Sequence, residues 1–338
     1  MPRSRAVEGS EAGYYHCLSR IVNRDFIFGD EEKEHFVALM RGYEAFCGVQ
    51  IVTYCIMSNH FHILVKVPRR PEVLPSDEVL INLARQADYS YDPGTLKQNL
   101  EQFREQGHDE AAEQLRERLF CRMWDVSWFM KMLKQRFSQW YNGRHDRKGT
   151  LWEERFRSVL VEGAGRALAA MAAYIDLNPF RAGIVDDPAR YRWCGYAEAV
   201  AGRKQARKGL GMAVEAALGN AVDPKRVMGE YRKHLFREGE REQRDEAGAV
   251  VRRGIGEERV KEVLASGGKL DLCEAIRCRV RYFCDGVVLG SRAFVNEFFR
   301  VNRCRFGSRR REGARRLHGI NAPDLFALRD VRAVSGSG

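Results

Sequence analysis

The sequence predicts an α+β protein, built on a ferredoxin-like (split βαβ) antiparallel sheet with helices on one face and a small α-rich C-terminal unit. Three observations carry this prediction. Apolar patterns follow the order strand, helix, strand, strand, helix, strand, helix over residues 13–177. Two central strand runs are separated by a short polar turn, as in a hairpin. The hydrophobic fraction of 44% is that of a folded chain.

The first four elements lie in the N-terminal quarter. Residues 13–22 are rich in aromatic and β-branched side chains, which favours a strand. Asp30 is expected to cap a helix, because apolar residues then recur at helical spacing. Residues 49–57 and 60–67 are two β runs joined by the polar turn.

The segment of residues 69–122 changes character and is interpreted as an insertion. It begins with prolines, becomes charged and helical, and interrupts a pattern that resumes after it. A helix over 127–143, a strand over 150–162 and an alanine-rich helix at about 166–177 then complete the predicted arrangement.

Three regions are therefore expected. Residues 1–200 form the main domain, which includes the insertion. Residues 201–254 form a basic, charged linker with one helix, because charge runs and glycines dominate there. Residues 255–338 form an α-helical C-terminal region that is a candidate for DNA binding. Helical patterns occur in these two regions at 223–236 and 291–301.

Composition narrows the class of partner. The formal net charge is +11, which favours a polyanion such as nucleic acid. No run of about 18 apolar residues occurs, so a membrane span is not expected. The N-terminus lacks a secretory pattern, which predicts a cytoplasmic protein. The nine cysteines include no CxxC pair and are expected to be reduced thiols.

The pair His60 and His62 is the first candidate for chemistry. Side chains alternate along a strand, so both imidazoles point to one face while Phe61 points to the other. Their Cα atoms are about 7 Å apart on a strand, so the two rings can converge on one cation. The alternative is a pair of hydrogen-bonded, inert histidines at a strand edge.

Tyr174 and Asn178 form the second candidate. They are four residues apart and share a helix face if the helix persists to that point. Pro179 places the helix end near Asn178, whose amide oxygen can supply a third metal ligand. Ala167 and Ala170 on the same line would leave room for a substrate strand beside the phenol. The alternative is a packed tyrosine followed by a structural helix end.

Arginines supply candidate phosphate contacts. Two lie in the predicted strand over 150–162, and eight occur with one glutamate between Arg300 and Arg316. Solvated basic residues are an equally good explanation of the C-terminal cluster. The candidates are Arg155, Arg157, Arg309, Arg310 and Arg311.

Three segments together resemble a known family. Residues 57–65 (MSNHFHILV) resemble the HUH signature (histidine, hydrophobic residue, histidine) of single-tyrosine transposases. Residues 149–156 and 174–183 resemble the strand, tyrosine helix and turn of that family. The group indicated is the REP-associated tyrosine transposases, which carry an IS200-like transposase domain. The resemblance covers roughly residues 13–200 without the insertion, and residues 283–299 resemble the C-terminal extension of longer members.

The resemblance implies a DNA transposase and endonuclease that cuts and rejoins single-stranded hairpin DNA through a 5′-phosphotyrosine. It assigns Tyr174 as the nucleophile, His60 and His62 as metal ligands, and Asn178 as the third ligand, where some relatives have glutamine. The implied cofactor is a divalent metal, Mg²⁺ or Mn²⁺. The implied partner is DNA with palindromic repeats, bound by a monomer or a homodimer.

Two other functions stay open at this point. One is a catalytically inactive, transposase-derived protein that binds hairpin DNA. The other is an HUH replication initiator or relaxase, although such proteins usually carry an ATPase unit and no GxxxxGK[ST] loop occurs in this sequence. The sequence of the DNA hairpin and of its cleavage site cannot be predicted from the chain.

Overall fold

The computed structural model describes residues 12–87, 92–235, 270–271, 276 and 281–329. Its centre is a sheet of seven strands in the order β2-β3-β1-β4-β6-β9-β7. Neighbouring strands are antiparallel except for the parallel pair β4 and β6. The strands are β1 (Ala12–Arg20), β2 (Gln50–Ile56), β3 (His60–Pro68), β4 (Arg157–Val161), β6 (Val288–Gly290), β7 (Arg315–Arg316) and β9 (Phe326–Leu328).

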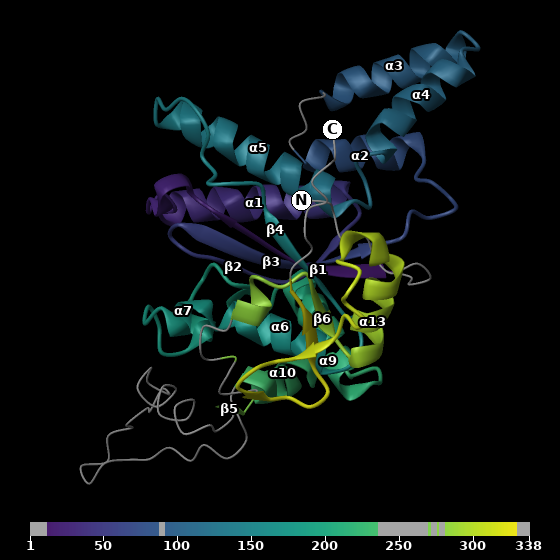
Figure 1. Cartoon of the computed structure of the whole chain (residues 1–338). Helices are drawn as coiled ribbons and strands as arrows, with labels where there is room; N and C mark the ends of the chain where they lie inside the picture. Colours follow the sequence, from purple (N-terminus) through teal and green to yellow (C-terminus); the bar gives the residue numbers. More distant parts are fainter. Residues whose placement is uncertain (1–11, 88–91, 236–269, 272–275, 277–280, 330–338) are drawn as a thin grey trace.

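The first four strands confirm the predicted split βαβ arrangement. Helix α1 (Asp30–Phe46) connects β1 to β2, and α5 (Val126–Arg144) connects the insertion to β4. Both helices cover the same face of the sheet (Figure 1). The alternating residues Phe61, Ile63 and Val65 of β3 are buried in that layer, as the sequence pattern predicts.

Helices also cover the opposite face, whereas the sequence predicts helices on one face. Helix α6 (Arg166–Asp176) packs there with α8 (Gly195–Val200), α9 (Lys204–Leu218) and α10 (Val227–Leu235) (Figure 1). The reason lies in the strands, because Val52 of β2 and Leu64 of β3 are apolar on this second face and are buried. A strand that is buried on both faces needs a helical layer on each side.

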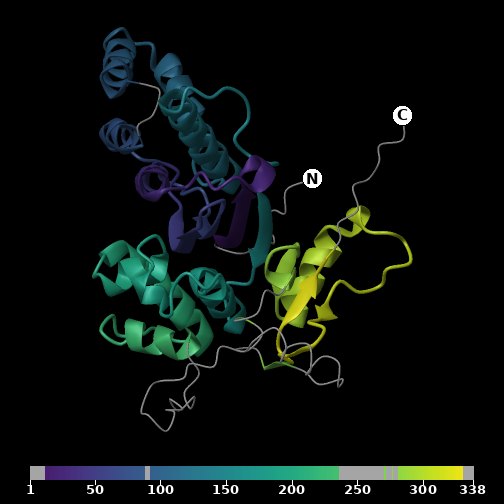
Figure 2. The same cartoon turned by 90° about the vertical axis from the view of Figure 1, so that its left-hand side faces the viewer.

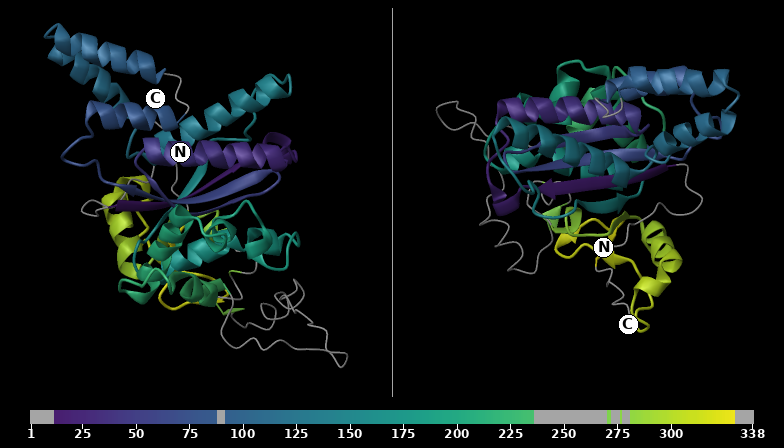
Figure 3. Two further views of the ribbon diagram at one scale, coloured as in Figure 1. Left: turned by 180° about the vertical axis from the view of Figure 1, so that it is seen from behind. Right: turned by 90° about the horizontal axis from the view of Figure 1, so that it is seen from above.

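The insertion consists of three helices. They are α2 (Asp77–Gln86), α3 (Pro93–Glu105) and α4 (Asp109–Phe120), which contact one another while α2 contacts α1. Figure 3 shows these blue helices reaching beyond the sheet in two further views. Their buried leucines, among them Leu80, Leu96 and Leu119, join the apolar layer of α1 and α5.

The region after residue 200 differs from the prediction. Residues 204–218, expected to be part of a basic linker, form α9, because Ala206, Leu210 and Val214 bury one side of a helix. The helical pattern over 223–236 corresponds to α10. Residues 236–254 of the predicted linker lie outside the described residues.

The C-terminal region contributes strands to the sheet, although the sequence predicts only helices there. Helix α13 (Arg292–Val301) is present as predicted. Beside it, β6, β9 and β7 extend the sheet from β4 (Figure 2), and β5 (Leu270–Asp271) pairs with β8 (Ile320–Asn321). Strands of two or three residues are too short to produce an alternating pattern in a sequence.

Two further details concern the first residue of α1 and the length and apolar character of the helices. Asp30 is the first residue of α1 rather than its cap, which is Gly29. None of the helices in the described part of the chain is long and apolar enough to cross a membrane.

Candidate catalytic site

Strand β3 begins with the histidine pair directly after the hairpin turn. The turn is closed by the Met57 amide, which donates to the carbonyl of His60 at 2.8 Å. Phe61 points into the layer of α1 and α5, and the two histidines therefore share the other face. Their ring centroids are 5.2 Å apart, with His60 half-buried and His62 only 3% exposed. The common orientation predicted by strand alternation is confirmed.

A third histidine, His16 of β1, completes this cluster and was not singled out from the sequence. Leu18 pairs with His62 in the β1–β3 register, so His16 lies diagonally across from His62 on the same face. Nε2 of His16 and Nδ1 of His62 are 2.8 Å apart, and the two rings meet edge to edge in nearly parallel planes, with centroids at 5.0 Å. On its other side, Nδ1 of His16 lies 2.8 Å from the carbonyl oxygen of Phe283.

Burial decides the charge of the two inner histidines. Burial lowers the pKa of His16 to about 4, an effect that the bond to the Phe283 carbonyl offsets only in part. Burial lowers the pKa of His62 well below its ordinary value as well, and the neighbouring His16 adds to the effect. Both imidazoles are therefore neutral near pH 7, so each has one ring nitrogen that donates and one that accepts.

Tyr174 faces this cluster from α6. Its ring centroid lies 6.2 Å from that of His62 and 6.4 Å from that of His16, both at a steep angle. Helix α6 lies close to the sheet because its alanines are small, and residues 167–176 are all buried. The fold thus brings the candidate nucleophile beside the histidine pair from a distant part of the sequence.

The phenol of Tyr174 is covered by the C-terminal region. Its ring stacks on Phe283 with centroids 4.7 Å apart, and its oxygen lies 3.0 Å from Sγ of Cys284. The side chain is 2% exposed. The room for substrate expected beside Ala167 and Ala170 is absent, because both alanines pack in the core and Phe283 lies against the phenol.

Arg181 adds a positive charge next to the tyrosine. Its guanidinium carbon is 4.2 Å from the centre of the Tyr174 ring. Its two terminal nitrogens donate to the carbonyls of Tyr174, at 2.8 Å, and Ile276, at 2.9 Å. The sequence offered no signal for this role beyond the position of Arg181 in the turn that resembles the family.

Asn178 closes the end of α6, as the sequence predicts. It begins the short helix α7 (Asn178–Arg181), and its Nδ2 donates to the carbonyls of Ile175 at 3.1 Å and Tyr174 at 3.4 Å. Among the described contacts, the amide group is thus engaged with the helix end rather than with the histidines. Its service as a third metal ligand remains a prediction.

Asp176 anchors the same helix end from inside the protein. Its carboxylate accepts hydrogen bonds from the hydroxyls of Thr53, at 2.7 Å, and Tyr231, at 2.6 Å, and from the backbone amide of Tyr196, at 3.2 Å. Burial raises the pKa of Asp176 to about 7 in spite of these three donors. Strand β2 and helices α8 and α10 are thereby tied to the helix that carries Tyr174.

The histidine pair fits a divalent cation as part of a ligand set. Nδ1 of His60 donates to Oδ1 of Asn59 at 2.7 Å, and Nδ2 of Asn59 donates to the Arg24 carbonyl, which fixes the orientation of the amide. In a neutral His60 ring this leaves the lone pair on Nε2. Within the described ranges there is no group of three or more His, Cys, Asp or Glu side chains that could hold a metal ion. Further ligands would have to be amide oxygens, water or the substrate.

The candidate arginines differ in exposure and in contacts. Arg155, Arg157, Arg309 and Arg311 are exposed, and Arg310 is half-buried. The guanidinium of Arg157 is bound to Glu154 at 2.6 Å and to Asp285 at 3.4 Å. Arg310 donates to three backbone carbonyls and lies over two phenylalanine rings, so it stabilises the C-terminal region. The groups that it contacts are Glu312, Gly313, Arg329, Phe299 and Phe306.

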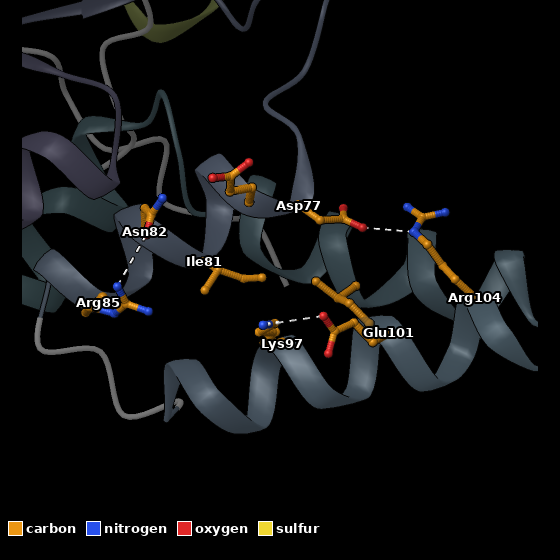
Figure 4. Close-up of a pocket in the computed structure, with 9 residues that line it drawn as sticks. Asp77, Ile81, Asn82, Arg85, Lys97, Glu101 and Arg104 are labelled. Atoms are coloured by element: carbon orange, nitrogen blue, oxygen red, sulfur yellow. Dashed lines mark hydrogen bonds and ion pairs between the residues drawn. The ribbon is translucent and has the colours of Figure 1, made fainter.

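A pocket of about 420 Å³ lies away from these residues, between α2 and α3 of the insertion. Figure 4 shows that its wall carries charges of both signs, with Asp77 bound to Arg104 and Lys97 bound to Glu101. Because these charges neutralise each other in pairs, the pocket offers little attraction for an anion. The candidate site is therefore the buried histidine cluster and not this pocket.

Comparison with known proteins supports the resemblance. Residues 10–76 match the family model of IS200-like transposases. The chain is also similar to a solved structure of a REP-associated tyrosine transposase bound to a REP hairpin, with 13% identity, 60% of this chain and 86% of that chain covered, and a TM-score of 0.37. That likeness is too distant to support an argument about architecture. No curated protein matches the chain.

The matched segment spans β1 to β3 and so contains the three histidines. Tyr174 and Asn178 lie beyond it. Over residues 10–76, the match confirms the predicted resemblance to the IS200-like transposase family.

Proposed function

We propose that this protein is a metal-dependent tyrosine transposase that cuts and rejoins single-stranded hairpin DNA, with Tyr174 as the nucleophile. One observation carries the proposal, namely the 6.2 Å between the ring centroids of Tyr174 and His62. A phenol, a pair of imidazoles on one face of β3 and a guanidinium meet at one place in the fold. These are the groups that an attack on a phosphodiester needs.

The proposed reaction exchanges one phosphodiester bond for another. The phenol of Tyr174 gives up its proton and its oxygen attacks the phosphorus, the P–O3′ bond breaks, and the 3′ oxygen leaves with the electron pair and takes up a proton. The products are a 5′-phosphotyrosine and a free 3′-hydroxyl. Attack by a 3′-hydroxyl from another strand reverses the step and restores Tyr174, so that rejoining requires no nucleotide cofactor.

Tyr174 requires activation, because a phenol has an ordinary pKa near 10. The guanidinium of Arg181 lies 4.2 Å from the ring centre and favours the negatively charged phenolate. His60 and His62 would hold a divalent cation through their Nε2 atoms, with Asn178 as a candidate third ligand. Such a cation supplies positive charge to the scissile phosphate. Mn²⁺ accepts imidazole more readily than Mg²⁺, which prefers oxygen ligands, and both remain candidates.

The proposed reaction also requires an opening. Tyr174 is 2% exposed beneath Phe283, so DNA reaches the phenol only after the C-terminal region has moved from it. The exposed Arg309 and Arg311 lie on that same region and are proposed to contact the phosphate backbone, joined by Arg155 beside β4.

The covered phenol also favours a second candidate function. A protein that binds hairpin DNA without cutting it has no need of an accessible nucleophile. In that case Tyr174 and Phe283 form a permanent part of the core, and the basic residues carry the whole function.

Covalent capture of DNA separates the two candidates. The full chain is incubated with end-labelled hairpin DNA and Mn²⁺, and adducts are resolved on a denaturing gel. The wild type is expected to give an adduct, and Tyr174→Phe is expected to bind the DNA without forming one. Tyr191→Phe, which removes another buried hydroxyl from the core, is the matched control and should still form the adduct.

Two other outcomes of this experiment would change the proposed function. An adduct with Tyr174→Phe assigns the nucleophile to a different residue. Binding of hairpins by the wild type without any adduct favours the inactive binding protein.

A further inference from the structure

We infer that His16 is a positioning residue that fixes the tautomer of His62, so that Nε2 of His62 presents its lone pair to a divalent cation. The inference deepens the proposed function and rests on it, because it takes His62 as a metal ligand. It starts from two hydrogen bonds in series, which join the backbone of Phe283 to His16 and His16 to His62.

The first bond sets the tautomer of His16. A backbone carbonyl oxygen can only accept a hydrogen bond. Nδ1 of His16 lies 2.8 Å from the carbonyl oxygen of Phe283, so this nitrogen carries the hydrogen. His16 is 1% exposed, and its described partners include no carboxylate that would hold a second proton, so the ring has a single N–H. Nε2 of His16 therefore has a lone pair and accepts.

The second hydrogen bond sets the tautomer of His62. Nδ1 of His62 lies 2.8 Å from Nε2 of His16, and it must donate because its neighbour accepts. An imidazole that binds a metal is neutral, so the remaining nitrogen of His62, Nε2, has the lone pair. The two rings lie edge to edge with 16° between their planes, so the N–H of one ring points along the lone pair of the other.

His60 is oriented by a different partner. Its Nδ1 donates to the amide oxygen of Asn59, so a neutral His60 also has its lone pair on Nε2. The two histidines thus present equivalent nitrogens from one face of β3. Partners that orient metal-ligating histidines typically change metal affinity by about 10- to 100-fold when removed. His16 would do this for His62, and Asn59 would do it for His60.

The two hydrogen bonds in series begin at Phe283, in the C-terminal region. Phe283 is the residue whose ring covers Tyr174, and its carbonyl sets the tautomer of His16. The state of the histidine pair is therefore linked to the position of the C-terminal region. The link runs through backbone, so a side-chain substitution at Phe283 leaves the accepting group in place.

The test uses the full chain without DNA, with Mn²⁺ alone as the probe. His16→Phe keeps a ring of similar size and removes the acceptor, whereas His16→Gln offers an amide oxygen in its place. Binding of Mn²⁺ is measured by electron paramagnetic resonance of the free ion. His16→Phe should bind Mn²⁺ about 10- to 100-fold more weakly than the wild type, and His16→Gln should recover most of the affinity. His35→Phe, a substitution of the same type in α1, should leave the affinity unchanged.

A second measurement reads the tautomer directly. Long-range ¹H–¹⁵N NMR spectra of the metal-free protein should show His62 protonated at Nδ1, and in His16→Phe this preference should be lost. A wild-type His62 protonated at Nε2 overturns the inference, as does a His16→Phe variant that binds Mn²⁺ like the wild type. Failure of the wild type to bind Mn²⁺ instead counts against the metal-dependent function, and the NMR spectra decide the role of His16 separately.

Discussion

Replacement of Asp176 with asparagine should change how the stability of this protein depends on pH. The carboxyl is fully buried and its pKa is raised from 3.8 to about 7 by burial. Asparagine has nearly the same shape, and its oxygen can accept the hydrogen bonds from Thr53 and the Tyr196 amide. The Tyr231 hydroxyl can turn to accept from the new NH₂ group. The fold of Asp176→Asn is therefore expected to be retained.

The direction in which stability changes with pH follows from the pKa of Asp176 in the folded protein and in the unfolded chain. Because the pKa of Asp176 is higher in the folded state, the folded protein holds the proton more tightly than the unfolded chain. The contribution of this group to stability is greatest below pH 3.8 and declines as the pH rises through about 7. Between pH 5 and pH 8, a shift of this size lowers the free energy of unfolding by roughly 2.5 kcal/mol. Asparagine does not titrate and contributes no such decline.

The assay is urea-induced unfolding of wild type and Asp176→Asn at several pH values from 5 to 8. All other titrating groups are shared by the two proteins, so their effects cancel in the difference between the free energies of unfolding. The variant should gain about 2.5 kcal/mol relative to wild type across this range. A difference that stays constant with pH would refute the reasoning, since the buried carboxyl would then not have a raised pKa.

Four further substitutions test the packing of α9 on the sheet, the cover over Tyr174 and the role of Arg181. Gly209→Ala should destabilise the protein by about 1–3 kcal/mol in urea unfolding, because an added Cβ would lie 2.4 Å from a carbonyl oxygen of β2. Gly211→Ala in the same helix meets only a side chain of α10 at 3.8 Å, and should be neutral or stabilising by up to ~1 kcal/mol. Phe283→Ala should make Tyr174 reactive toward tetranitromethane, whereas wild-type Tyr174 should resist nitration; equal reactivity in both proteins would contradict the covered site. Arg181→Lys should slow DNA adduct formation by roughly tenfold or more, because an ammonium group cannot reproduce the guanidinium that lies over the ring and donates to two carbonyls, and an unchanged initial rate would exclude this role.

The sequence predicted the local part of the candidate site. Alternation along β3 places His60 and His62 on one face because Phe61 must enter the core. The proline after Asn178 marks the end of the tyrosine helix. These inferences need only neighbouring residues, which is why a single sequence can support them.

The remaining part of the site depends on contacts between distant segments. His16 stands in an aromatic strand without a motif, and it becomes a partner of His62 only through the register between β1 and β3. Phe283 and Cys284 lie more than a hundred residues after Tyr174. Phe283 ends a single turn of 3₁₀ helix and Cys284 follows it, and so short a helix produces no periodic pattern in the sequence. Local pattern does not contain this information.

The number of helical layers on the sheet also could not be predicted from local sequence patterns. Ile63 and Leu64 are both apolar and point to opposite faces of β3, so the strand is buried on both sides. An apolar run of this kind fits either one layer of helices or two. The second layer, α6 with α8, α9 and α10, is therefore visible only in the structure.

The central claim is that the oxygen of Tyr174 becomes bonded to DNA. The most direct measurement is mass spectrometry of the trapped adduct after digestion with trypsin and nuclease. The tryptic peptide of residues 167–181 contains one tyrosine and no serine or threonine, so a modified hydroxyl in it is unambiguous. We predict a nucleotide attached through its 5′-phosphate to Tyr174. A nucleotide found on any other residue would contradict the assignment.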